Sequence, residues 1–298
     1  MADLQWYPGH MTKARRMMEE NISLVDLVIE LTDARAPLSS RNPDIDTLSR
    51  GKARMLLLNK ADLADPAQTE RFCAYFEKQG IQCVPLDARN RKMNDQIRRR
   101  VQEACREKLE RNKRRGILNR PLRAMVVGIP NVGKSTFINS FAGKASAKTG
   151  NKPGVTRGKQ WIRLNKELEL LDTPGILWPK FDDPEIGIRL ALIMAIREEI
   201  LNEQELAVYL LGFLKDYYPG VLGERYSTAE KPFDTDTSDQ ELLTQIAQNK
   251  QLIAKGQTPD LTRACRMLLE DFRTGRLGRI TLEQPELDQT EDAVNEET

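Results

Sequence analysis

The segment GIPNVGKS, residues 128–135, decides the fold of this chain. It matches the phosphate-binding pattern GxxxxGK[ST] in full. An apolar run over residues 122–127 is typical of a buried strand and precedes it, and a helical pattern over residues 134–141 follows it. A chance glycine–lysine turn would not need that context. A strand, a glycine-rich turn and a helix in this order predict a loop whose backbone N–H groups surround the phosphates of a nucleotide.

The side chains at the end of this segment have defined tasks in such a loop. Lys134 is expected to reach the β- and γ-phosphates, and the hydroxyl of Ser135 to coordinate Mg²⁺. The nucleotide-binding residues expected from this loop are Asn131, Val132, Gly133, Lys134, Ser135 and Thr136.

A second segment, DTPG at residues 172–175, follows a predicted strand over residues 168–171. A carboxylate in this position is where nucleotide-binding proteins of this kind hold Mg²⁺, so Asp172 is a predicted Mg²⁺ ligand. The backbone N–H of Gly175 is expected to sense the γ-phosphate. Thr156 lies between the two segments and is expected to close on Mg²⁺ in the triphosphate state. Alone, DTPG is also compatible with a type II turn.

The segment NKAD, residues 59–62, follows the short apolar run 55–58 and fits the pattern NKxD. Asp62 would accept the N1–H and the exocyclic amino group of guanine, a pair of donors that adenine lacks. Asn59 is expected to bind the acceptor edge of the base and to tie this loop to the phosphate loop. The stem of Lys60 is expected to lie over the ring.

A third short segment, Asp87-Ala88-Arg89, follows the predicted strand 81–86. It falls where many GTPases carry Ser-Ala-Lys, and because that contact is made largely by backbone, the Asp and Arg change the interpretation little. The base-binding residues expected from both segments are Asn59, Lys60, Ala61, Asp62, Asp87 and Ala88.

The order of these segments is unusual, because NKxD precedes the phosphate loop. The carboxyl ends of parallel strands form one rim of a sheet, so rejoining the strands in another order can preserve the site. Strands alternating with helices predict an α/β fold with a doubly wound, mostly parallel sheet over residues 1–182. From Pro184 the periodicity is helical throughout, which predicts a smaller all-α domain over residues 183–282.

Charge is unevenly distributed along the chain, although the formal net charge is only +2. A predicted helix over residues 93–115 is strongly basic, and Arg263, Arg266 and Arg273 form a stripe at helical spacing. Both are compatible with contacts to an RNA backbone, and both are also compatible with ordinary solvated faces. Residues 283–298 are acidic and are expected to be a disordered tail.

Other features exclude several classes of protein. The four cysteines form no CxxC pair and, with the single histidine, no recognised zinc spacing, which favours reduced thiols. No apolar run approaches the length that spans a membrane, and no apolar leader precedes the first helix. We therefore expect a monomer in the cytoplasm with no membrane partner.

The chain resembles the circularly permuted GTPases, and within them the ribosome biogenesis GTPase A group. The resemblance rests on the order NKxD, GxPNVGKS, DTPG, on WYPGHM at residues 6–11 and on DARAPLSSRNP at residues 33–43. It is specific over residues 1 to about 180 and looser beyond. It implies GTP and GDP as ligands, and a cytoplasmic factor in late assembly of the large ribosomal subunit that contacts its rRNA.

The hydrolytic machinery is less clear from the sequence. Ile176 stands where many small GTPases place a glutamine that orients the attacking water, so we expect slow basal turnover that ribosomal particles stimulate. His10 is the candidate catalytic residue, beside Lys134 and Thr156, although it could equally cap or pack a helix. In some GTPases with a similar phosphate loop, an asparagine in the position of Asn131 coordinates K⁺.

Two other functions remain open at this point. A regulatory GTPase could signal to a protein partner without RNA, and an ATPase could carry NKxD by coincidence. Nucleotide selectivity distinguishes the ATPase from a GTPase. Salt-sensitive binding to ribosomal RNA distinguishes a ribosome assembly GTPase from a regulatory one.

Overall fold

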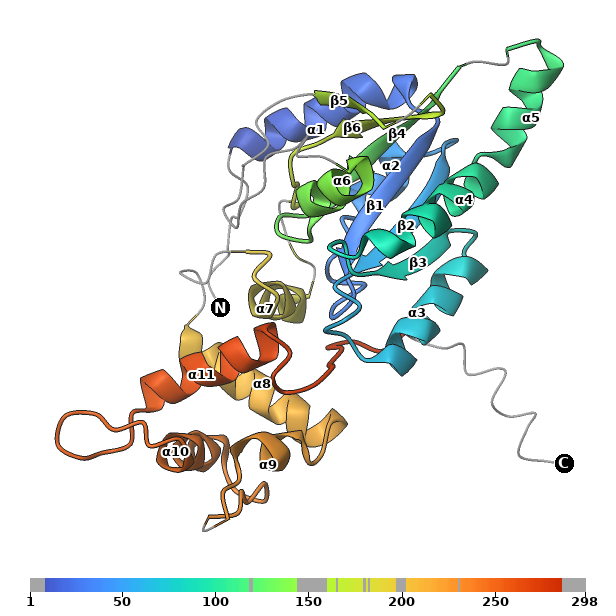
Figure 1. Cartoon of the computed structure of the whole chain (residues 1–298). Coiled ribbons are helices and arrows are strands. Elements are labelled where there is room, and N and C mark those ends of the chain that lie inside the picture. The colour runs from blue at the N-terminus through green and yellow to red at the C-terminus, as the bar shows by residue number, and fades with distance from the viewer. Residues whose placement is uncertain are drawn as a thin grey trace, which may run out of the picture.

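The computed structural model describes residues 9–117, 120–143, 160–164, 166–178, 181, 183–196, 202–229 and 231–285. Its centre is a six-stranded sheet with the order β3-β2-β1-β4-β6-β5 (Figure 1). Every neighbouring pair is parallel except β5 and β6, which are antiparallel. This confirms the predicted mostly parallel sheet. The strands are β1 (Leu27–Asp33), β2 (Ala53–Asn59), β3 (Gln82–Leu86), β4 (Leu122–Val127), β5 (Gln160–Arg163) and β6 (Leu168–Asp172).

Helices cover both faces of this sheet. One face packs against α1 (Gly9–Asn21), α2 (Asp44–Leu48) and α3 (Pro66–Lys78), and the other packs against α4 (Asn94–Ala104) and α6 (Lys134–Ala142). Successive side chains of a strand point to opposite faces, so an apolar residue at every position of a central strand serves both layers. This explains the continuous apolar runs in the sequence, each buried side chain stabilising the fold by roughly 1.5–3 kcal/mol.

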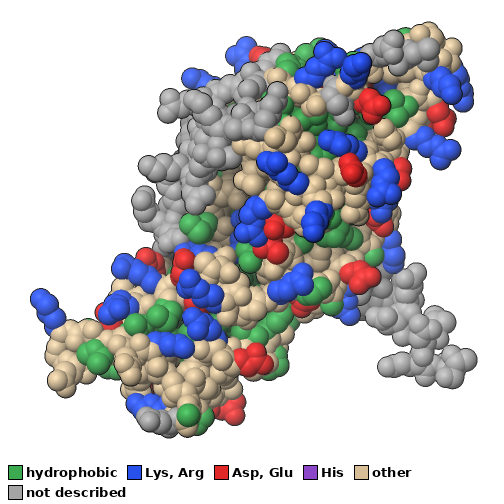
Figure 2. All heavy atoms as spheres, in the orientation of Figure 1, with side chains coloured by type: hydrophobic (Ala, Val, Ile, Leu, Met, Phe, Trp, Pro, Cys, Tyr) green, Lys and Arg blue, Asp and Glu red, His purple; other side chains and the backbone are tan. Residues whose placement is uncertain are grey.

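The predicted basic helix over residues 93–115 is not continuous. A 3₁₀ turn, η2 (Arg91–Met93), leads into α4, which ends at Ala104. Cys105 separates it from α5 (Arg106–Arg114). None of the described residues of α5 is buried, and the helix projects from the body of the molecule (Figure 1). Figure 2 shows Lys and Arg side chains gathered over this projecting end. A sequence with so few apolar residues has little to pack, which explains why α5 extends into solvent.

The second domain is helical, as predicted. Its elements are α7 (Pro184–Leu192), α8 (Glu203–Tyr217), α9 (Val221–Tyr226), α10 (Asp239–Asn249) and α11 (Leu261–Arg273). The side chain of Asp183 caps the first turn of α7, and Ser238 with Glu241 forms a capping box at the start of α10. Within the described residues, no helix is long and apolar enough to cross a membrane.

After α11 the chain returns to the α/β domain. Leu282 and Glu283 are buried there, and the carboxylate of Glu283 accepts hydrogen bonds from the backbone N–H groups of Leu38 and Ser39 at 2.7 and 2.9 Å. The prediction that an acidic disordered tail begins at residue 283 is therefore wrong at its first residue. Residues 286–298 lie outside the described part of the chain.

Candidate nucleotide site

Loops from five parallel strands meet at the carboxyl rim of the sheet. In the register, Asp33 at the end of β1 lies beside Asn59 at the end of β2, and Asn59 lies beside Leu86 at the end of β3. On the other side, Val126 near the end of β4 lies beside Asp172 at the end of β6. The segments that the sequence singled out are thus brought to one edge despite their permuted order.

The phosphate loop has the backbone that its glycines allow. Gly128 and Gly133 have φ angles of +145° and +97°, and Asn131 has +61°. A Cβ added to Gly133 would lie 2.2 Å from Nδ2 of Asn59, so no larger residue fits there. Gly133 precedes α6 and no side chain caps this helix, which leaves its first N–H groups directed toward the site of an anion.

Lys134 is buried in the loop, with 8% of its surface exposed. Its ammonium group donates to the carbonyl oxygens of Gly128 and Ile129 at 2.9 and 2.7 Å. Burial lowers the pKa of Lys134 to about 8, and the nearby carboxylate of Asp172 opposes that shift only in part. A buried cation held by neutral carbonyl groups suits a ligand that brings negative charge.

Gly175 of the DTPG segment closes the loop from the other side. A Cβ at this position would lie 2.8 Å from the backbone nitrogen of Pro130 and 3.0 Å from Nζ of Lys134. The next residue, Ile176, donates its N–H to the carbonyl of Gly128 at 3.3 Å. A side chain at residue 175 would therefore fill the space beside the ammonium group, and glycine keeps that space open, as the predicted contact to the γ-phosphate requires.

The donor set fits Mg²⁺. Ser135 supplies a hydroxyl in the first turn of α6, and Asp172 supplies a carboxylate that is 1% exposed at the end of β6. Mg²⁺ prefers such oxygen ligands, completed by phosphate and water. Among the described residues no cluster of three or more His, Cys, Asp or Glu side chains forms a separate metal site. Thr156 lies outside the described residues.

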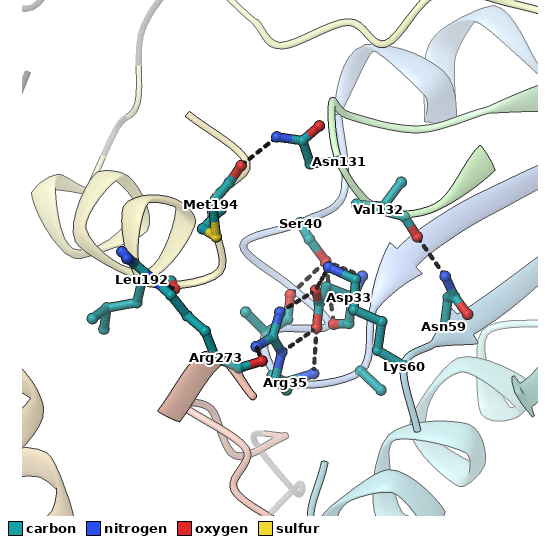
Figure 3. A network of polar contacts seen from close by, with 12 residues as sticks. Asp33, Arg35, Ser40, Asn59, Lys60, Asn131, Val132, Leu192, Met194 and Arg273 are labelled. Carbon is teal, nitrogen blue, oxygen red and sulfur yellow. Dashed lines mark hydrogen bonds and ion pairs between the residues drawn. The ribbon is translucent and has the colours of Figure 1, made fainter. Parts of the chain in front are cut away.

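Asn59 joins three of the loops. Its Nδ2 donates to the carbonyl of Val132 at 2.6 Å (Figure 3). Its Oδ1 accepts from the N–H of Ala88 at 2.8 Å. The predicted tie to the phosphate loop is therefore present. Nδ2 carries a second N–H, so the tie to Val132 leaves one donor for the acceptor edge of a base, and that contact stays a prediction.

Lys60 is anchored by a buried charge network at the end of β1. Its φ is +60°, and its Nζ lies 2.8 Å from Oδ2 of Asp33, which Arg35 also contacts at 2.8 Å (Figure 3). Burial alone would raise the pKa of Asp33, but the charges of Arg35 and Lys60 outweigh it and hold that pKa well below its ordinary value. Sequence reasoning missed Asp33 and Arg35, although an acid at the end of a buried strand was a usable signal.

Asp62, the predicted reader of guanine, is engaged by Arg89. Nη2 of Arg89 lies 2.6 Å from Oδ2 of Asp62, and its Nε lies 2.8 Å from Oδ1 of Asp87. The arginine that we treated as a minor departure from the usual pattern is thus in direct contact with the carboxylate that we predict to read the base.

Comparison with known proteins identifies this arrangement. Residues 123–212 match the family described as 50S ribosome-binding GTPase. The chain is 45% identical over 283 residues to ribosome biogenesis GTPase A of Bacillus pumilus, across 95% of this chain and 99% of that protein. It is 47% identical to ribosome biogenesis GTPase A of Bacillus cereus, across 95% of this chain and 94% of that protein. The chain belongs to the ribosome biogenesis GTPase A family. It is therefore a GTPase.

Solved structures agree with this family. The GDP-bound structure of TM YlqF aligns with a TM-score of 0.66 at 26% identity, covering 91% of this chain and 99% of that chain. GNP-bound YlqF from T. maritima aligns with a TM-score of 0.62 at 26% identity, covering 92% and 99%. The matched family region begins at β4, while the NKAD segment precedes it, as the permuted order of this ribosome biogenesis GTPase requires.

The other predicted site residues of this GTPase are spread over the molecule. His10 is in the first turn of α1, but its side chain lies outside the described part. Nδ2 of Asn131, the predicted K⁺ ligand, donates to the carbonyl of Met194 at 2.7 Å (Figure 3). Arg263 and Arg266 are exposed on α11, and Arg266 pairs with Glu203 at 2.8 Å.

Arg273 does not belong to an exposed stripe. Its guanidinium group donates to the carbonyl oxygens of Leu192 and Ala191 at 3.2 and 3.3 Å, at the end of α7. The helical spacing that groups it with Arg263 and Arg266 could not show that another helix packs at that end of α11.

Proposed function

We propose that this GTPase acts in late assembly of the large ribosomal subunit, in the cytoplasm and as a monomer, and that its helical domain reports the state of the bound nucleotide. The relatives of similar length carry names that place them in ribosome biogenesis. The observation that carries the relay is the contact between Asn131 of the phosphate loop and Met194, which follows α7.

This contact couples the nucleotide site to the helical domain. Met194 has a φ of +63°, a conformation that costs energy for a residue with a long side chain and persists only where its surroundings hold it. Arg273 of α11 holds the end of α7 only a few residues earlier. A phosphate group that moves Asn131 would therefore release or tighten α7, and α11 would follow.

Two surfaces are suited to RNA. One is α5, where Arg111, Lys113 and Arg114 are exposed, and the other is the outer face of α11 with Arg263 and Arg266. Figure 2 shows Lys and Arg side chains at both ends of the molecule. Acidic residues lie among them, so we expect contacts to a few phosphates rather than a continuous basic channel.

Co-sedimentation with purified large ribosomal subunits tests the proposal. We expect more GTPase in the pellet with a non-hydrolysable GTP analogue than with GDP, and a steep loss with salt, by about 0.9 log unit per log unit of salt for each phosphate contact. Charge reversal at Arg263 and Arg266 should weaken this binding without changing GTP affinity. Equal amounts of GTPase in the pellet with both nucleotides would contradict the proposal that the helical domain reports the nucleotide state. No salt-sensitive binding to subunits or rRNA would favour a regulatory GTPase that acts on a protein.

A further inference from the structure

The chain that leaves the helical domain crosses back over the loop that carries Asp62. We name residues 276–283 the C-terminal strap. Figure 1 shows it running from the end of α11 toward α3. Although it has no regular secondary structure, Leu277, Ile280, Thr281 and Leu282 are all at most 4% exposed. A segment so thoroughly buried is part of the fold rather than a loose end.

Arg279 of the strap binds both sides of the base-reading residue. Its Nη2 donates to the carbonyl of Ala61 at 2.8 Å, and its Nε donates to the carbonyl of Ala64 at 3.0 Å. Ala61 immediately precedes Asp62, and Ala64 lies two residues after it. One guanidinium group thus fixes the loop on either side of the carboxylate.

The strap also completes the backbone hydrogen bonding of this loop. The N–H of Ile280 donates to the carbonyl of Leu63 at 3.1 Å, and the N–H of Asp65 donates to Oγ1 of Thr281 at 3.1 Å. The hydroxyl of Tyr218, which directly follows α8, accepts from the N–H of Thr281 at 3.0 Å and donates to its carbonyl at 3.1 Å. A residue of the helical domain therefore holds the strap in place over the loop.

The far end of the strap is fastened to the α/β domain. Leu282 donates its N–H to the carbonyl of Arg35 at 2.7 Å, next to the buried Asp33 network, and Glu283 accepts from Leu38 and Ser39. The loop around Asp62 is thus held between its own strand and a segment whose position depends on α8 and α11.

We propose that the strap fixes the base-reading loop, that Arg279 and Thr281 are positioning residues for the guanine nucleotide, and that the helical domain thereby sets how fast the nucleotide leaves. The inference rests on the proposed role of Asp62 as the reader of guanine. A loop that loses these bonds leaves polar backbone groups to water and no longer presents its carboxylate in one orientation.

Release of fluorescent GDP from the full-length protein tests this inference. Arg279→Ala should release GDP about tenfold faster than wild type, as expected for the loss of two modest hydrogen bonds. Arg279→Lys should be intermediate. Thr281→Val keeps the shape of the side chain and should still accelerate release, which covers the case in which Arg279→Ala folds poorly. Arg276→Ala is the matched control, because Arg276 lies in the same segment but contacts Asp271.

A second measurement separates positioning from general loosening. Inosine diphosphate lacks the amino group that Asp62 is proposed to bind. A misplaced Asp62 should therefore lower the affinity for GDP more than the affinity for inosine diphosphate. The preference for GDP over inosine diphosphate should fall in Arg279→Ala and stay at the wild-type value in Arg276→Ala. Equal release rates in Arg279→Ala and Arg276→Ala, or equal acceleration for both nucleotides, would overturn the inference. Asp62→Asn checks the premise separately: if it retains GDP as well as wild type, the base site is wrongly assigned.

Discussion

Arg89 and Asp62 form an ion pair at the base site, with Nη2 of the arginine 2.6 Å from Oδ2 of the carboxylate. Asp87 holds the same guanidinium group at 2.8 Å. A carboxylate has lone pairs for about four hydrogen bonds, so guanine and Arg89 can share it. We therefore expect Arg89 to orient the acid toward the base instead of competing with it.

Arg89→Ala should therefore weaken GDP binding, and the affinity for GDP should fall more than the affinity for inosine diphosphate. We expect a loss of about two- to fivefold, because an ion pair this exposed is worth ~1 kcal/mol or less. Equilibrium titration with both nucleotides measures it, and Arg91→Ala is a nearby control on an exposed residue. Tighter GDP binding in Arg89→Ala would show that the arginine blocks the site.

GTP binding should depend on pH through Lys134. Burial lowers its pKa to about 8, and the negative charge of bound phosphates should raise it again. Binding must then take up a proton at pH 8.5, and affinity should fall as pH rises above about 8. Calorimetry in two buffers of different ionisation enthalpy counts the protons. Lys134→Arg cannot titrate in this range, so any uptake that persists in that variant would exclude Lys134 as its source.

The buried acid Asp33 should matter more to stability than a surface acid. Asp33→Asn removes the partner of Arg35 and Lys60, and an uncompensated buried charge costs roughly 3–5 kcal/mol. Asp44→Asn is the control, because the ion pair of Asp44 with Arg15 is partly exposed and worth ~1 kcal/mol or less. Urea unfolding of both variants compares them, and equal losses would contradict the assigned role of the network.

His10 stays a prediction for hydrolysis. His10→Ala should lower kcat on ribosomal subunits and leave GTP affinity nearly intact, as removal of a group that acts only in the transition state does. Single-turnover hydrolysis measures it, and the same assay should run faster in K⁺ than in Na⁺ if Asn131 helps to bind that ion. A wild-type rate would leave His10 as a helix-capping residue.

Sequence alone could predict the sheet and the rim, because apolar runs of strand length each ended in a recognisable segment such as NKAD or DTPG. It could not predict what depends on distant packing. The contact of Arg273 with α7 and the buried Glu283 each depend on a partner far along the chain. Local spacing carries no information about such partners, so a helical stripe and an acidic tail were the natural interpretations.

The central claim is that NKAD and the permuted phosphate loop together form one guanine site, and nucleotide selectivity tests it most directly. We would measure the affinities of wild type and Asp62→Asn for GTP, ATP and xanthosine triphosphate. The account predicts that wild type strongly prefers GTP. It also predicts that Asp62→Asn loses a few kcal/mol of GTP binding, because a charge-assisted pair is removed, and gains affinity for xanthosine triphosphate, whose carbonyl replaces the amino group. Equal affinity of wild type for ATP and GTP, or an unchanged preference in Asp62→Asn, would contradict it.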